Sequence, residues 1–216
     1  MKNLKTSVFV LAILFCITSS AHALPTIYTV VMDASGSVGD SDFRKANQAP
    51  KALLKMLYDA SQLPINLGRP ADFISIGWFG GNDDFAQLPY INVSDITKAA
   101  VISGALERIK HPKYGYTAIY TALLKATSSA IDQEKALNGN YNQVIIVVTD
   151  GKDTQSPLEV KALTRRIFPN DKIFVSIVGV GPSADISEFE FADDRRNIAD
   201  FDELKVVFGL ISGFFR

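Results

Sequence analysis

The fold is decided by residues 27–37, which read IYTVVMDASGS. The first six residues form a short apolar run rich in β-branched side chains, which is typical of a strand buried on both faces of a parallel sheet. The next five place a carboxylate, Asp33, and two hydroxyls, Ser35 and Ser37, at every second position. A turn through Gly36 can bring these three side chains toward one point. Oxygen ligands without His or Cys suit Mg²⁺, Mn²⁺ or Ca²⁺ rather than zinc, so this loop is a candidate cation site.

Strand-like and helix-like segments alternate along the rest of the chain. Further strands are expected at 72–79, 85–93, 141–149, 172–180 and around Ile198. Helices are expected at 40–62, 94–109, from Thr117, at 156–168, at 185–192 and from Asp202. The strand at 85–93 follows a glycine-rich turn and should run antiparallel to its predecessor. The order predicts a single Rossmann-like, doubly wound α/β domain: a mostly parallel sheet with one antiparallel edge strand and helices on both faces.

The first 23 residues have the features of a secretory signal peptide. Lys2 and Lys5 give a positive start, an apolar stretch runs from Val8 to Ile17, and Ala21-His22-Ala23 offers a cleavage site. A transmembrane anchor is disfavoured because the apolar stretch is shorter than the ~20 residues that span a bilayer. We therefore expect residues 1–23 to be a signal peptide, residues 24–216 to be the mature domain, and the product to be periplasmic or secreted.

Cleavage at this site narrows the chemistry open to the mature chain. It removes Cys16, the only cysteine, and leaves a single histidine, His111. A lipoprotein acylated at Cys16 is disfavoured because the bulky Phe15 precedes it. Without a cysteine, the mature chain cannot form disulfides, thiolate metal sites or a cysteine nucleophile. Loss of the two leader lysines leaves 20 basic residues against 23 acidic ones, which argues against a nucleic-acid partner. No later segment is long and apolar enough to span a membrane.

Polar residues follow two apolar strands and precede one helix. Asp33 and Asp150 each follow such a strand, and Thr117 lies in a polar loop before a helix. Ligands of open α/β sheets bind at the carboxyl ends of the strands, so Asp33, Ser35, Ser37, Thr117 and Asp150 are expected to meet at one edge. Any one of these residues alone could instead cap a helix or tighten a turn.

The complete set of motifs resembles the metal-ion-dependent adhesion site of the von Willebrand factor A domain family. The motifs are D-x-S-x-S after the first strand, Gly-x-Thr at 115–117 and Thr-Asp-Gly at 149–151, in that order. The resemblance extends to Val178-Gly179-Val180-Gly181 and to Asn197–Phe201, and thus covers the whole expected mature chain.

The resemblance implies a role for each of the five residues. Ser35 and Ser37 would bind the ion directly, and Thr117 would join them in the ligand-binding state. Asp33 and Asp150 would act mainly through water. Because few carboxylates would touch the ion, one position would stay open for a carboxylate of a protein partner. The implied function is a non-enzymatic binding module that uses Mg²⁺ or Mn²⁺, with Ca²⁺ as a further candidate.

Two other functions compete with this one, a metal-independent scaffold with a vestigial site and a metal-dependent hydrolase. Ser35 lacks the glycine two residues earlier that a nucleophile elbow requires. Gly39-Asp40-Ser41 is similar to the start of the SGNH esterases, but their later Asp-x-x-His is missing, since Arg108 stands three residues before His111. We interpret His111, beside a proline, as a structural surface residue.

Overall fold

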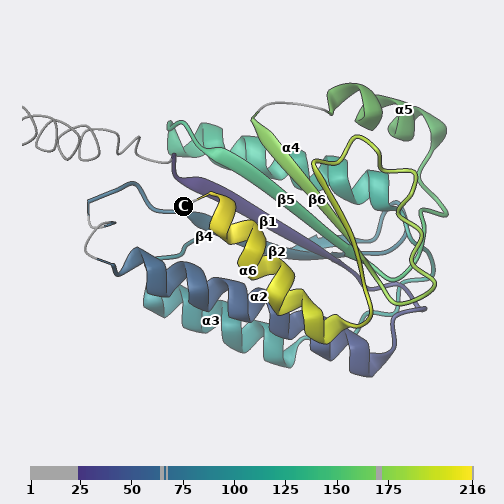
Figure 1. The fold of residues 1–216 in the computed structure, drawn as a ribbon, viewed down its shortest axis with the longest axis horizontal. Helices are drawn as coiled ribbons and strands as arrows, with labels where there is room; N and C mark the ends of the chain where they lie inside the picture. The colour runs from purple at the N-terminus through teal and green to yellow at the C-terminus, as the bar shows by residue number, and fades with distance from the viewer. Residues whose placement is uncertain (1–23, 64–65, 67, 169–171, 216) are drawn as a thin grey trace, which may run out of the picture.

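The computed structural model describes residues 24–63, 66, 68–168 and 172–215. The predicted signal peptide, residues 1–23, lies outside these ranges. The described chain runs from the first strand to the last helix of the predicted domain (Figure 1).

The predicted first strand, β1, lies inside a seven-stranded sheet and is buried along its whole length. The strands are β1 (Thr26–Asp33), β2 (Phe73–Phe79), β3 (Phe85–Gln87), β4 (Ile91–Asn92), β5 (Asn142–Thr149), β6 (Ile173–Val180) and β7 (Asp194–Ile198). Their order is β3-β2-β1-β5-β6-β7, with β4 also paired to β2. The pairs among β1, β2, β5, β6 and β7 are parallel, and β3 and β4 run antiparallel to β2. The predicted mostly parallel sheet with an antiparallel edge is confirmed.

Helices cover both faces of the sheet, as predicted (Figure 1). The helices are α2 (Asp40–Ser61), α3 (Ile96–Arg108), α4 (Ile119–Leu137), α5 (Leu158–Ile167) and α6 (Leu204–Phe214), and a short 3₁₀ helix, η2 (Phe201–Glu203), precedes α6. One core lies between the sheet and α2, α3 and α6, and the other lies mainly between the sheet and α4. Among the residues that the structure describes, no helix combines the length and the apolar character needed to cross a membrane.

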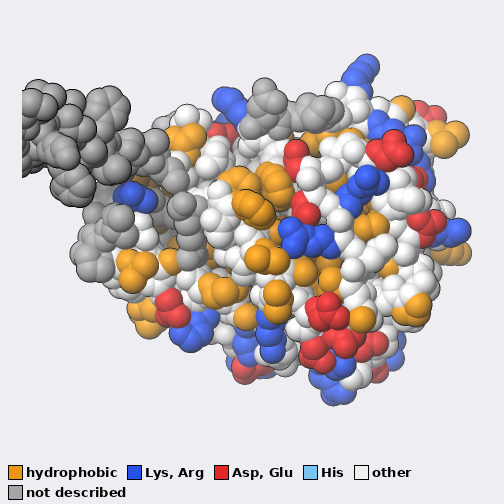
Figure 2. Space-filling view, viewed as in Figure 1, with side chains coloured by type: hydrophobic (Ala, Val, Ile, Leu, Met, Phe, Trp, Pro, Cys, Tyr) orange, Lys and Arg blue, Asp and Glu red, His pale blue; other side chains and the backbone are white. Residues whose placement is uncertain are grey.

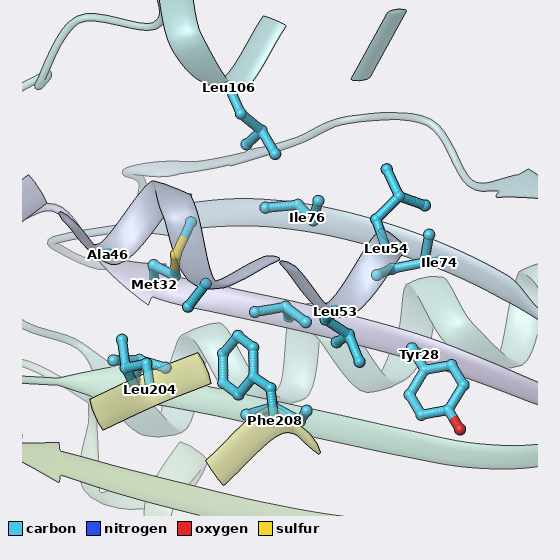
Figure 3. Packing of buried hydrophobic residues seen from close by; sticks show 14 of the residues in the cluster. Tyr28, Met32, Ala46, Leu53, Leu54, Ile74, Ile76, Leu106, Leu204 and Phe208 are labelled. Atoms are coloured by element: carbon cyan, nitrogen blue, oxygen red, sulfur yellow. The ribbon is translucent and has the colours of Figure 1, made fainter. Parts of the chain in front are cut away.

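The core beside α2 and α6 shows how β1 is enclosed (Figure 3). Tyr28 and Met32 of β1 lie against Leu53 of α2 and Phe208 of α6, and all four are at most 1% exposed. Ile27 and other alternate residues of β1 face the second core, below α4. The continuous apolar run of the sequence therefore reflects a strand that is buried on both faces.

Two details of the predicted elements differ from the structure. The strand expected at 85–93 is split into β3 and β4; Pro89, which lies between them, has no backbone N–H to donate to a partner strand. The helix expected at 185–192 is wrong, because this segment forms turns. There, Asp185 Oδ1 accepts hydrogen bonds from the amide and the hydroxyl of Ser187, an arrangement that competes with helix formation. Phe189 is fully buried and packs on the Tyr120 ring, with 4.8 Å between ring centres.

The neighbours β1 and β5 form the switch point of the sheet. From β1 the chain crosses through α2 to β2 on one side, whereas from β5 it crosses through α5 to β6 on the other. The loops that leave β1 and β5 therefore diverge and leave a crevice at the carboxyl ends of the strands. Three of the five predicted site residues, Ser35, Ser37 and Asp150, lie in these two loops, and Asp33 is the last residue of β1.

Candidate metal centre

Asp33, the last residue of β1, anchors the loop of residues 33–37, which we call the metal loop. Its side chain is buried, with 2% of the residue exposed. Its Oδ1 accepts a hydrogen bond from the Ser35 amide at 2.8 Å, and its Oδ2 accepts one from Thr149 Oγ1 at 2.7 Å. Asp33 thus bends the metal loop over its own carboxylate and joins the ends of β1 and β5.

The hydroxyls of the metal loop continue this network toward β5. Ser35 Oγ and Ser37 Oγ lie 2.9 Å apart, and Ser37 Oγ donates to Asp150 Oδ1 at 2.9 Å. Two ligands at right angles, each about 2.1 Å from a Mg²⁺ ion, lie about 3 Å from one another. The spacing of these oxygens therefore suits neighbouring positions around a small divalent cation.

Thr117 lies in a third loop at this edge, just before α4. The next amide, that of Ala118, donates to the Gly80 carbonyl beyond the end of β2 at 2.7 Å. The Thr117 carbonyl accepts from the amides of Thr154 and Gln155 at 2.9 and 3.3 Å. Across the described ranges, no hydrogen bond joins the Thr117 side chain to the other four predicted residues. The structure thus connects Asp33, Ser35, Ser37 and Asp150 directly, and leaves Thr117 outside their network.

The carboxylates of Asp33 and Asp150 are partly shielded from solvent, which disfavours their charged forms. Burial raises the pKa of Asp33 to about 6, although hydrogen bonds from Thr149 and Ser35 oppose this shift. Burial also raises the pKa of Asp150, against the hydrogen bond from Ser37. A bound cation would offset both charges, so the residues present fit a divalent ion. Within the described residues, no group of three or more His, Cys, Asp or Glu side chains is placed to hold a metal. The oxygens gathered here come from two hydroxyls, Ser35 and Ser37, as well as from the two carboxylates.

His111 supports the metal loop from the side of α2. Its side chain is only 4% exposed, and its ring stacks on Phe43 with 4.6 Å between ring centres. Nδ1 lies 3.1 Å from Asp40 Oδ1 and Nε2 lies 3.2 Å from the Ala34 carbonyl oxygen. These contacts agree with the structural role predicted for His111, and its ring is more enclosed than the sequence indicates. Nothing in the local sequence predicts this position, because Asp40 lies 71 residues away.

Asp153 is a buried residue of the site region that the sequence analysis missed. Its fully buried carboxylate forms an ion pair with Lys161 Nζ at 2.6 Å. Asp153 Oδ1 also accepts hydrogen bonds from Ser156 Oγ at 2.6 Å and from the Tyr120 amide at 3.4 Å. These bonds hold the start of α4, and with it the Thr117 loop, against the loop after β5. Its position three residues after Asp150 was the one feature of the sequence that could have indicated a role near the site.

This chain belongs to the von Willebrand factor type A domain family, whose sequence profile matches residues 29–206. Membership of this family, predicted from the motifs, is therefore confirmed. No curated protein matches the chain.

Solved structures share this fold at low sequence identity. Proximal thread matrix protein 1 from the mussel byssus, in a structure with a zinc-occupied MIDAS motif, is 19% identical with a TM-score of 0.63, over 87% of this chain and 47% of its own. The pilus adhesin SpaC from Lactobacillus rhamnosus GG, in its open conformation, is 11% identical with a TM-score of 0.65, over 90% of this chain and 30% of its own. The ArnB paralog VWA2 from Sulfolobus acidocaldarius is 19% identical with a TM-score of 0.55, over 85% and 44%. The chain spans less than half the length of each of these structures.

Proposed function

We propose that this domain is a protein-binding module that engages its partner through a divalent cation at an intact metal-ion-dependent adhesion site. The observation that carries the proposal is the continuous network from buried Asp33 through Ser35 and Ser37 to Asp150. One similar structure holds zinc at its own MIDAS motif, and another is a pilus adhesin. The first likeness supports metal binding by this chain, and the second supports an interaction role.

The proposed division of labour follows from the chemistry of the side chains. Ser35 and Ser37 would bind Mg²⁺ or Mn²⁺ through neutral hydroxyls, while Asp33 and Asp150 would orient them and act through water. Thr117 would reach the ion only when its loop shifts toward the metal loop on ligand binding. Neutral ligands leave the positive charge of the ion under-compensated, so a carboxylate of the partner would be attracted to the remaining position.

We assign no catalytic reaction to this site. A hydrolytic role would require a general base beside a metal-bound water. His111, the histidine of the described residues, is stacked on Phe43, and both ring nitrogens face oxygen acceptors. These contacts favour a supporting role for the imidazole over proton transfer at the metal loop.

We also propose that the domain is exported after removal of residues 1–23. This proposal rests on the charged start, the apolar stretch and the Ala21-His22-Ala23 site of the sequence. The intact mass of the exported product tests it, with Leu24 expected as the first residue. A product that keeps the leader, or one that begins at an acylated Cys16, would contradict the proposal.

Metal titration of the purified domain tests the proposed site. Calorimetry with Mg²⁺, Mn²⁺, Ca²⁺ and Zn²⁺ should detect one site, and a metal concentration of about 100 times Kd should stabilise the fold by about 2.7 kcal/mol. The double variant Ser35→Ala/Ser37→Ala should lose both effects. Ser187→Ala is the matched control, because that exposed hydroxyl bonds only to Asp185 among the described residues. Equal stabilisation of the double variant and the parent would place the metal elsewhere.

A further inference from the structure

A groove of about 420 Å³ lies between the beginning of α2 and the segment that follows α3. Four cationic side chains line it, Arg44 from α2 and Arg108, Lys110 and Lys113 from the end of α3 and the loop beyond it. All four are exposed to solvent. We call this surface the basic groove.

The positive charge of the basic groove exceeds its negative charge. Its two acidic residues already have cationic partners: Asp40 pairs with Lys113 at 3.1 Å, and Glu107 pairs with Lys51 at 2.5 Å. By contrast, three cations of the groove take part in no ion pair within the described ranges; they are Arg44, Arg108 and Lys110. The groove therefore presents unpaired cations, although the chain as a whole has a formal net charge of −1.

The basic groove shares a wall with the metal loop. His111 lines the groove and contacts the Ala34 carbonyl, to which the Tyr114 amide also donates at 2.9 Å. Between them, Lys113 has a φ of 54°, a left-handed conformation that is uncommon for a residue other than glycine. The segment from His111 to Tyr114 is thus held in a constrained conformation between the groove and the proposed metal centre.

The flank of the site nearest α6 has the opposite charge. Its acidic residues are Asp42, Asp200, Asp202 and Glu203, and Figure 2 shows acidic side chains gathered over the start of α6. Lys45 pairs with Asp202 at 3.2 Å and is influenced by the charges of Asp42 and Asp200. The charge of Asp42 is also felt at Asp150. A negatively charged segment that leaves the metal centre would therefore be repelled from this flank and attracted to the basic groove.

We infer that the basic groove binds an acidic protein segment belonging to the same partner whose carboxylate reaches the metal ion. This inference rests on the proposed function and extends it by naming the chemistry and the direction of the partner. Asp or Glu side chains of the segment would pair with Arg44, Arg108 and Lys110. Because these cations are exposed, they would mainly speed association and select for acidic sequences, and their effect would weaken in salt.

A charge-reversal experiment tests the inference. The probe is a fluorescent synthetic peptide of alternating Glu and Ser, and its binding is measured by anisotropy at low ionic strength, with Mg²⁺ and with EDTA. Arg44→Glu/Lys110→Glu should weaken binding in Mg²⁺ by about tenfold or more, since two exposed attractions become repulsions. The matched control is Lys135→Glu/Arg166→Glu, which changes net charge equally on α4 and α5, on the opposite face of the sheet. The control should bind the peptide like the parent.

The outcomes separate the groove from the metal centre. Loss of binding in the groove variant but not in the control supports the inference, and groove-dependent binding that EDTA leaves unchanged would count against the metal proposal alone. Equal weakening of the groove variant and the control, or an unchanged groove variant, would overturn the inference while EDTA-sensitive binding still supported the metal site. The inference would also be overturned if the parent did not bind the peptide. If a single-stranded oligonucleotide bound more tightly than the peptide and without Mg²⁺, the inference would be overturned, because the ligand of the groove would then be a nucleic acid and not an acidic protein segment.

Discussion

Replacing Asp33 by Asn tests whether the metal loop is built around a buried charge. The amide oxygen of Asn can still accept from the Ser35 amide, as Asp33 Oδ1 does at 2.8 Å. The amide nitrogen can donate to Thr149 Oγ1, whose own hydrogen can turn to the Gly151 carbonyl, 3.4 Å away. The variant therefore keeps the shape of the loop and removes only its charge.

The expected magnitude follows from the pKa of Asp33. Burial raises this pKa from 3.8 to about 6, so between these values the folded protein binds more protons than the unfolded chain. The free energy of unfolding therefore falls as pH rises through this window, by about 3 kcal/mol in total for a shift of about two pKa units. The amide replaces the protonated carboxyl with less favourable hydrogen bonds, which returns about 1 kcal/mol of this difference. Above pH 6, Asp33→Asn should stabilise the metal-free domain by about 2 kcal/mol, which corresponds to a melting temperature about 4–8 °C higher.

Thermal and urea unfolding in excess chelator measure this effect. The gain should be present at about pH 7.5 and absent at about pH 4, where Asp33 is already largely protonated in the fold. Asp132→Asn is the control, because that side chain is 70% exposed and should change stability by less than about 0.5 kcal/mol. Added Mg²⁺ should stabilise the parent and leave Asp33→Asn unchanged. Lower stability of the variant at about pH 7.5, or the same difference at both pH values, would refute the reasoning.

Two further predictions concern the supports of the site. Lys161→Met should lower the free energy of unfolding by about 3 kcal/mol, because it leaves the buried Asp153 carboxylate without its cation. In urea unfolding, adding Asp153→Asn to this variant should recover much of the lost stability. Strictly additive losses of the two substitutions would contradict the pairing. Gly80→Ala should cost about 1–3 kcal/mol and weaken metal binding in calorimetry, because the new Cβ would lie 2.1 Å from Tyr114 Cβ. Gly115→Ala, which meets open space, is its control, and equal effects of the two alanines would contradict the steric argument.

The elements of the sheet were largely predictable from sequence because their signals are local. β1, β5 and β6 are apolar runs bounded by polar turns, and each is predicted within two residues of its observed bounds. Interactions with other segments caused the errors. The helix predicted at 185–192 has suitable apolar spacing, but Phe189 is drawn into the ring cluster around Tyr120, and Asp185 bonds the Ser187 amide instead of leaving it to a helix.

The sequence by itself determined the family, the sheet and the proposal that polar residues after β1 and β5 converge, since parallel strands bring their carboxyl ends to one edge. Only the tertiary structure decided which of them are joined. Among the described residues, the hydrogen bonds connect Ser37 to Asp150, 113 residues away, and leave the Thr117 side chain outside the network. It also decided that His111 is enclosed beside Phe43 and that Arg44 faces the same groove as Lys110. These relations depend on how α2 and the segment after α3 pack against each other, and residue spacing along the chain carries no information about that packing.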